Sequence, residues 1–222
     1  SLREALRALS PGQKLSVECF AVDMHEPFMN AIRAECPNAM ICVDRFHLAQ
    51  KVNEAFDKVR KGEFKKAREG GQIFEQGMLE PHRRFVLVSR DADLSKSEAR
   101  MLEKLRRINR PINDAMLLVE TFHRMLDAKT VKRFRQLLRA WYCLVREAKL
   151  EAFTKLAGLI RRYRSEIEAY IASRLTTGVA EGLNNKIKVL KRMAYGYSNP
   201  VSFCRKILQR CGYLNHLSIN TN

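Results

Sequence analysis

The chain has 222 residues and a formal net charge of +17, from 41 basic and 24 acidic side chains. Its hydrophobic content of 46% predicts a packed core for one domain or two small ones. It has no run of about 18 uncharged apolar residues, which excludes a helix that crosses a membrane. The positive charge is spread over many segments, and this predicts a nucleic acid as partner, because phosphates attract Lys and Arg.

The first region, residues 1–69, is predicted to hold two strands and two helices. One run of strand-forming residues ends at Asp23, and a second apolar run ends at Asp44. Pro27 opens a helix between them, and a longer helix is expected over residues 45–68 because apolar residues recur there every three or four positions. This order predicts two parallel neighbouring strands, with both aspartates at the same sheet edge.

The second region, residues 70–175, is predicted to be almost wholly helical. Ser95 and Glu98 form the spacing of a capping box at the start of one helix. The run over 85–89 is open to two interpretations, a strand or the start of a helix. The predicted helices cover residues 95–107, 111–126, 130–147, 150–158 and 159–173.

The third region, residues 176–222, contains one acid in a strongly basic setting. A helix is predicted over 177–193, then a turn over 195–199 and a last helix over 200–210. Glu181 lies near the start of the first helix, where the helix dipole favours an anion. The alternative is a metal-binding carboxylate beside a surface that binds phosphate.

Residues 181–188 read EGLNNKIK and are followed by Lys191, Arg192 and the run AYGY. This stretch resembles the C-terminal signature of the ISL-type insertion-sequence DDE transposases, in which Glu-Gly-x-Asn-Asn-Lys-x-Lys carries the last catalytic acid. The resemblance implies that Glu181 is catalytic and binds metal, and that the partner is double-stranded DNA. The residues expected to bind DNA are Arg45, Asn184, Asn185, Lys186, Lys188, Lys191 and Arg192.

The same resemblance covers the ends of the two predicted strands. The run VDMHEPF around Asp23 resembles the second acid of the family, and the run from Asp44 to His47 resembles its Asp-Arg-Phe-His signature. Asp23 is therefore expected to be catalytic and to bind metal, with Asp44 as the alternative second acid. His47 is expected either to make a polar contact at the strand–helix junction or to orient the active site. The implied cofactors are two Mg²⁺ or Mn²⁺ ions, which favour carboxylate oxygens and lie about 4 Å apart in such sites.

The expected fold class is α/β and mostly helical: an incomplete ribonuclease-H-like βαβα core, an all-α insertion and a C-terminal basic helix. The first aspartate of the family has no counterpart here, since only Glu4 and Glu18 precede Asp23 and neither suits a first strand. We therefore expect the chain to be the C-terminal half of a transposase and to be inactive by itself.

Three functions are compatible with these features. The first is DNA cleavage and joining during transposition. The second is that of a non-catalytic DNA-binding remnant or regulatory product of a mobile element. The third is that of a basic helical scaffold that binds protein or RNA. The family implies a homo-oligomer in a bacterial cytoplasm, associated with the nucleoid. The six cysteines lack Cys-x-x-Cys spacing and are expected to be free thiols.

Overall fold

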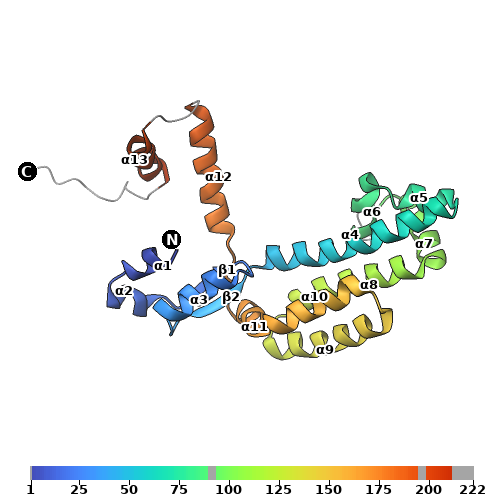
Figure 1. The fold of residues 1–222 in the computed structure, drawn as a ribbon, viewed down its shortest axis with the longest axis horizontal. Helices are drawn as coiled ribbons and strands as arrows, with labels where there is room; N and C mark the ends of the chain where they lie inside the picture. Colours follow the sequence, from blue (N-terminus) through green and yellow to red (C-terminus); the bar gives the residue numbers. More distant parts are fainter. Residues whose placement is uncertain (1, 90–93, 195–198, 212–222) are drawn as a thin grey trace, which may run out of the picture. The chain divides into compact units, whose positions relative to one another are not determined.

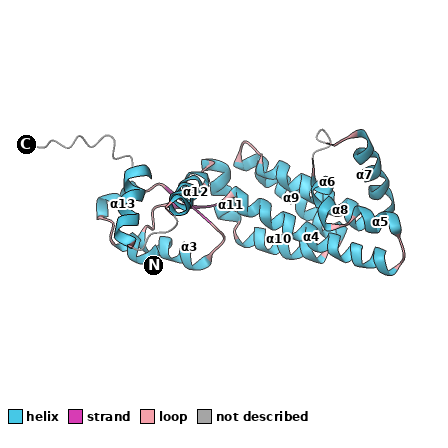
Figure 2. Ribbon diagram, turned by 90° about the horizontal axis from the view of Figure 1, so that it is seen from above, coloured by secondary structure: helices cyan, strands magenta, loops and turns pink. Residues whose placement is uncertain are grey.

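The computed structural model describes residues 2–89, 94–194 and 199–211, and most of them are helical (Figures 1 and 2). The chain divides into two compact units, residues 1–175 and 176–222. The mostly helical fold predicted from the sequence is confirmed. Within the described ranges, no helix has the length and apolar character needed to cross a lipid bilayer.

Unit 1 contains the two strands, and they pair in parallel as predicted. β1 (Cys19–Val22) pairs with β2 (Met40–Val43), with Cys19 opposite Met40 and Val22 opposite Val43. α3 (Glu26–Glu35) connects them. Parallel strands need a crossover connection, and α3 provides it.

Two short helices precede the sheet, α1 (Leu2–Arg7) and α2 (Pro11–Ser16). Leu6 of α1 packs with Ile32 of α3 in a small apolar cluster. The second helix was not predicted, although its signal is present in the sequence. Ser10 and Gln13 form a complete capping box, and a proline occupies the first turn.

The rest of unit 1 is a helical bundle in which α4, α8, α9 and α10 run alongside one another (Figures 1 and 2). Side-chain caps explain several starts: Asp44, Ser95, Asn109 and Thr130 each accept a backbone N–H of the helix that follows. The helices are α4 (Arg45–Glu69), α5 (Ile73–Met78), η1 (Pro81–Arg83), α6 (Arg84–Val88), α7 (Lys96–Ile108), α8 (Arg110–Leu126), α9 (Val131–Ala148), α10 (Glu151–Arg162) and α11 (Arg164–Ser173).

One hydrophobic core extends from the sheet into the bundle. It includes Cys42 and Val43 of β2 together with Trp141 of α9, whose indole N–H donates to the carbonyl of Leu118 at 3.0 Å. α11 lies against β2. The last helix of unit 1 thus covers a strand that comes early in the sequence of the same unit. The carboxylate of Glu166 accepts from the guanidinium of Arg33 in α3 at 2.7 Å, which fixes α11 over the sheet.

Unit 2 consists of α12 (Gly178–Met193) and α13 (Pro200–Cys211), which pack against each other. Both helices were predicted. The start of α13 is capped by Asn199, whose side-chain oxygen accepts from the N–H of Val201 at 2.8 Å. Most of the turn predicted over 195–199 lies outside the described residues.

Candidate functional site

Two aspartates follow the two strands at the same edge of the sheet. Asp23 follows β1, and its side chain is 53% exposed. Asp44 follows β2, and its backbone N–H donates to the carbonyl of Val22 at 3.1 Å. Its side chain is only 3% exposed and accepts from the N–H of Phe46 at 3.2 Å, as the cap of α4. The two carboxylates therefore differ: that of Asp44 is committed to the helix start, and that of Asp23 is open to solvent.

His47, in the first turn of α4, lies next to both aspartates. Its Nδ1 is 2.9 Å from Oδ1 of Asp23 and 3.7 Å from Oδ2 of Asp44. This nitrogen is buried, and the contact with Asp23 has the distance of an ion pair but not the angle of a hydrogen bond. The structure thus brings together three of the residues singled out in the sequence.

Arg45, expected to bind DNA, forms an ion pair within the protein. Its guanidinium is 2.6 Å from Oδ1 of Asp127, which is the C-cap of α8. Arg174 holds the same turn, because its guanidinium donates to the carbonyls of Leu126, at 2.9 Å, and of Ala128. Neither Asp127 nor Arg174 was predicted. Together the two arginines attach the turn between α8 and α9 to the start of α4 and to the end of α11.

Glu181 lies in the first turn of α12, in unit 2, and is exposed. At 3.6 residues per turn, the helix divides the predicted DNA-binding residues between its faces. Lys188 and Arg192 follow Glu181 on one face, together with Asn184 and Asn185. Lys191 flanks this face, whereas Lys186 points away from it, toward the side of Leu183, Ile187 and Leu190. All of the predicted DNA-binding side chains of α12 are exposed.

The donor chemistry at the strand ends suits a divalent metal ion only in part. An exposed carboxylate at Asp23 is a fitting ligand for a hard cation such as Mg²⁺. The buried carboxylate of Asp44 already accepts from a backbone N–H. Within residues 2–89, 94–194 and 199–211 there is no group of three His, Cys, Asp or Glu side chains that could hold an ion. In this cluster the carboxylate of Asp23 is thus the one that is open to solvent, whereas that of Asp44 serves as a helix cap.

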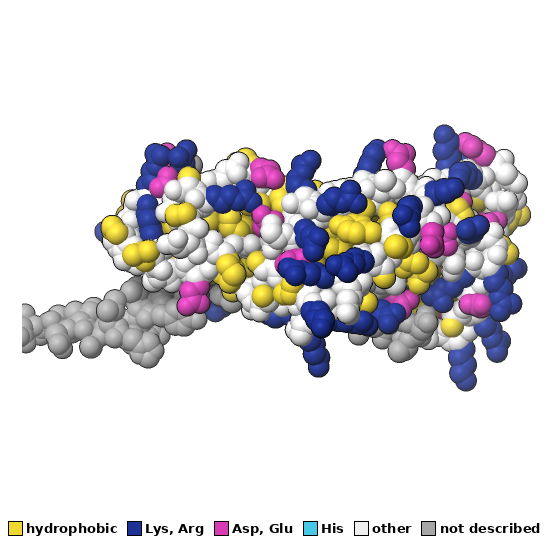
Figure 3. Space-filling model, turned by 90° about the horizontal axis from the view of Figure 1, so that it is seen from below, with side chains coloured by type: hydrophobic (Ala, Val, Ile, Leu, Met, Phe, Trp, Pro, Cys, Tyr) yellow, Lys and Arg dark blue, Asp and Glu magenta, His cyan; other side chains and the backbone are white. Residues whose placement is uncertain are grey.

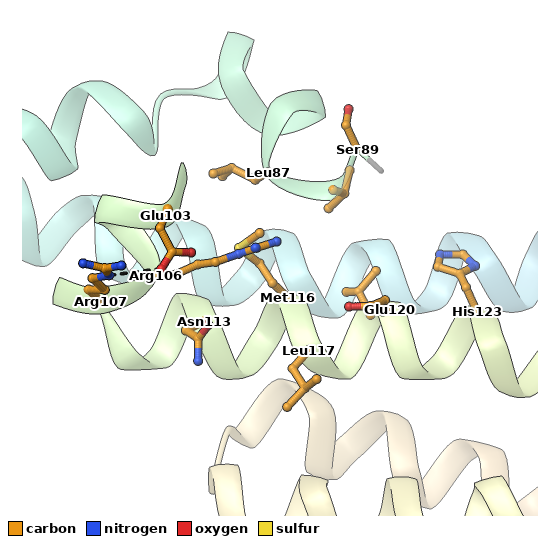
Figure 4. Close-up of a pocket in the computed structure, with 12 residues that line it drawn as sticks. Leu87, Ser89, Glu103, Arg106, Arg107, Asn113, Met116, Leu117, Glu120 and His123 are labelled. Atoms are coloured by element: carbon orange, nitrogen blue, oxygen red, sulfur yellow. Dashed lines mark hydrogen bonds and ion pairs between the residues drawn. The ribbon is translucent and has the colours of Figure 1, made fainter. Parts of the chain in front are cut away.

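A cleft of about 810 Å³ lies between α6, α7 and α8 (Figure 4). Leu87 and Met116 line its apolar part, and the ion pair between Glu103 and Arg107 lies at one end, with an N–O distance of 3.0 Å. None of the predicted site residues lines this cleft. It is separate from the strand-end cluster of Asp23, Asp44 and His47.

Comparisons with known proteins agree with the signature residues. A model of the ISL3-type DDE transposase family, described as a transposase, matches residues 1–207. The transposase for insertion sequence element IS1001 of Bordetella parapertussis is 30% identical over 210 residues, which cover 92% of this chain and 51% of that protein. The transposase for insertion sequence element IS1557 of Mycobacterium tuberculosis is 24% identical over 211 residues, which cover 87% of this chain and 47% of that protein.

The chain thus spans about half the length of the curated relatives it matches. No solved structure matches it. The family match covers both the strand-end cluster and the α12 signature. The chain therefore belongs to the ISL3-type family of DDE transposases.

Proposed function

We propose that this chain carries part of the catalytic core of an insertion-sequence transposase, which cleaves and joins double-stranded DNA with Mg²⁺ or Mn²⁺. Asp23 and Glu181 are two of its metal-binding acids. The observation that carries the proposal is the strand-end cluster, in which His47 approaches an exposed Asp23 to 2.9 Å. The parallel strands and their helices are the βαβα part of a ribonuclease-H-like core, residues 70–175 are the helical insertion, and residues 176–222 bring the last acid.

The three residues of the cluster have different tasks in this proposal. Asp23 binds metal, because its carboxylate is exposed at the end of β1. His47 positions it, since Nδ1 of His47 lies 2.9 Å from Oδ1 of Asp23. Asp44 holds the start of α4 through its cap, which places His47 one turn later. When bound, the metal pair would activate the attacking hydroxyl and stabilise the leaving oxygen.

α12 contributes both an acid and a surface for the DNA backbone. Lys188 and Arg192 share the face of Glu181, so phosphates attracted by these cations would lie beside the carboxylate. Lys186, on another face, is not expected to contact the same phosphates. The two lysines thus form a matched pair for a binding experiment, because both are exposed, both lie on α12 and each carries one charge.

Binding to duplex DNA should distinguish the two lysines. Lys188→Gln is expected to weaken binding by roughly 3- to 10-fold and to lower the slope of log K against log salt by about 0.9, the value for one phosphate contact. Lys186→Gln should change both quantities less. Equal losses in the two variants would show that the charge of the helix, and not the face of Glu181, determines binding.

Catalysis is tested by nicking of DNA that carries the ends of the insertion sequence, with Mg²⁺ or Mn²⁺ added. The 222-residue chain is expected to be inactive alone, because Asp23 and Glu181 by themselves are an incomplete set of ligands. Metal-dependent cleavage by this chain that Glu181→Ala abolishes would contradict that expectation. A full-length transposase with this sequence should cleave, and Asp23→Asn or Glu181→Gln should abolish its activity while leaving its affinity for DNA within a few-fold. Cleavage that survives both changes would refute the assignment of the acids.

Assembly into a homo-oligomer on paired DNA ends is part of the same proposal. It rests on the family, whose members act on two ends of one element. Light scattering of the full-length protein with and without end DNA tests it, and a mass that stays monomeric with DNA bound would contradict it.

A further inference from the structure

We infer that the outer face of α9 is a second DNA-binding surface, formed by Lys132, Arg139 and Arg146 and separate from α12. The inference rests on the proposed function, because it takes duplex DNA as the ligand. It adds a surface in the helical region that none of the family signature residues occupies.

The sequence of α9 separates apolar and basic residues almost completely. Phe134, Leu138, Trp141 and Val145 are buried and point into the core. Lys132, Arg139 and Arg146 follow one another at intervals of seven residues on the opposite, exposed face. The indole of the buried Trp141 also donates to the carbonyl of Leu118, so this face of the helix is held in the core while the three cations lie on the solvent side.

The three cations have no acidic partner among the residues that the structure describes. Several exposed cations elsewhere in unit 1 pair with a carboxylate one turn away, as Lys61 does with Asp57 at 2.8 Å. Even on α9, Arg135 is committed to Glu168 at 2.6 Å. The only acid within α9 is Glu147, near its end. Lys and Arg side chains accordingly gather on the side of unit 1 seen from below, where α9 lies (Figures 1 and 3).

The spacing of this row suits the DNA backbone. Seven residues of helix rise by about 10 Å, so Lys132 and Arg146 lie about 21 Å apart along the axis. Each DNA strand carries one phosphate per roughly 3.4 Å of axis, so the long side chains of cations about 10 Å apart on the helix can reach different phosphates of the duplex. A second copy of the chain is a poor occupant, since a face of cations repels itself. A membrane is also a poor occupant, because the apolar face that would insert is already buried in the core.

The test compares duplex DNA binding by three versions of the 222-residue chain. The surface variant carries Lys132→Gln, Arg139→Gln and Arg146→Gln. The control carries Lys61→Gln, Arg107→Gln and Lys155→Gln, which removes the same charge from exposed cations whose nearest acids are 2.8, 3.0 and 2.5 Å away. The third version is the unchanged chain. Fluorescence anisotropy with a 30-base-pair duplex of arbitrary sequence gives the dissociation constant over a salt series.

The surface variant is expected to bind on the order of 10- to 100-fold more weakly, with a salt slope lower by about 2.7, which is three contacts at about 0.9 each. The control should change affinity less than about 3-fold, because its cations are already neutralised by neighbours. Equal losses in the two triple variants would overturn the inference, since overall charge would then explain binding. So would an unchanged surface variant, or binding of an acidic polypeptide but not of the duplex.

The outcome for α9 can be read separately from that for α12. If Lys188→Gln weakens binding and the α9 variant does not, the α9 surface is refuted while the proposed function stands. If the α9 variant weakens binding and Lys188→Gln does not, the inference is supported and the assignment of the α12 face fails. All three α9 substitutions replace exposed residues by a good helix former, so the fold should persist. The three single substitutions provide a second measurement, since each should lower the slope of log K against log salt by about one third of the change in the triple variant.

Discussion

Asp44 combines a structural bond with a position beside the proposed catalytic residues, and two substitutions separate these roles. Asp44→Ala removes the side-chain acceptor for the N–H of Phe46, whereas Asp44→Asn keeps an acceptor and removes the charge. Loss of an N-cap of this kind costs about 1 kcal/mol, within a range of roughly 0.5–2, and Asn caps nearly as well as Asp. Asp44→Ala should therefore lower the unfolding free energy of unit 1 by about 1–2 kcal/mol, and Asp44→Asn by less than about 0.5.

Urea unfolding followed by tryptophan fluorescence measures this difference. The chain has one tryptophan, Trp141, and it lies buried in the core of unit 1, so its emission reports on the unit that contains Asp44. At the melting temperature, 1 kcal/mol corresponds to about 2–4 °C for a unit of this size. Equal midpoints for the two variants, or a larger loss in Asp44→Asn, would refute the capping role. In that case the buried charge itself, next to His47, would be what stabilises the fold.

Three further predictions concern the stability of unit 1. The pKa of Cys42 is raised to about 12 from an ordinary 9.0, mainly by burial and secondly by the neighbouring Cys19 thiol. The contribution of the Cys42 thiol to stability is thus complete below pH 9 and is lost as pH rises toward 12. Urea midpoints of the unchanged chain should therefore fall in alkali, and those of Cys42→Ala should fall less steeply. Hydrogen bonds from Arg135 and then Arg164 hold the pKa of Glu168 below its ordinary 4.5, so its stabilisation is present above that value and is lost as pH falls through the folded pKa. Glu168→Gln should therefore unfold more easily at neutral pH and lose part of the acid dependence; identical acid profiles would contradict this. Finally, a double-mutant cycle of Arg45→Ala and Asp127→Ala should give a coupling energy of about 0.2–1 kcal/mol, as for exposed pairs. A coupling of zero, with weaker DNA binding in Arg45→Ala, would favour the DNA-binding role.

Local patterns were enough to predict most of the fold. The two strands were identified because each is a short apolar run that ends in an aspartate, and their parallel pairing followed from the helix between them. The capping box at Ser95 was visible for the same reason, since its partner Glu98 is three residues away. Gly158 was wrongly taken as a helix end. A glycine costs a helix only about 1 kcal/mol, and the burial of Phe153, Leu156 and Ile160 on either side outweighs it.

The candidate site was predictable only where residues carry a family signature. Asp23, Asp44 and His47 were singled out, and the structure brings them together. Asp127 and Arg174 were not, because their partners lie far away in the sequence: the bond from Arg174 to Leu126 joins residues 48 positions apart. No periodicity or local spacing encodes such a contact. It arises only after the helices have packed.

The contact between α11 and β2 has a consequence for how the chain folds. Arg33 and Glu166 are 133 positions apart, so the bond that fixes α11 over the sheet closes a very long loop. The packing of α8 against α9, by contrast, joins helices that follow each other in the sequence and closes only a short loop. Two strands alone are marginally stable in water. We therefore expect β1 and β2 to become stable only after α11 has formed, and the bundle to acquire protection from hydrogen exchange before the sheet does.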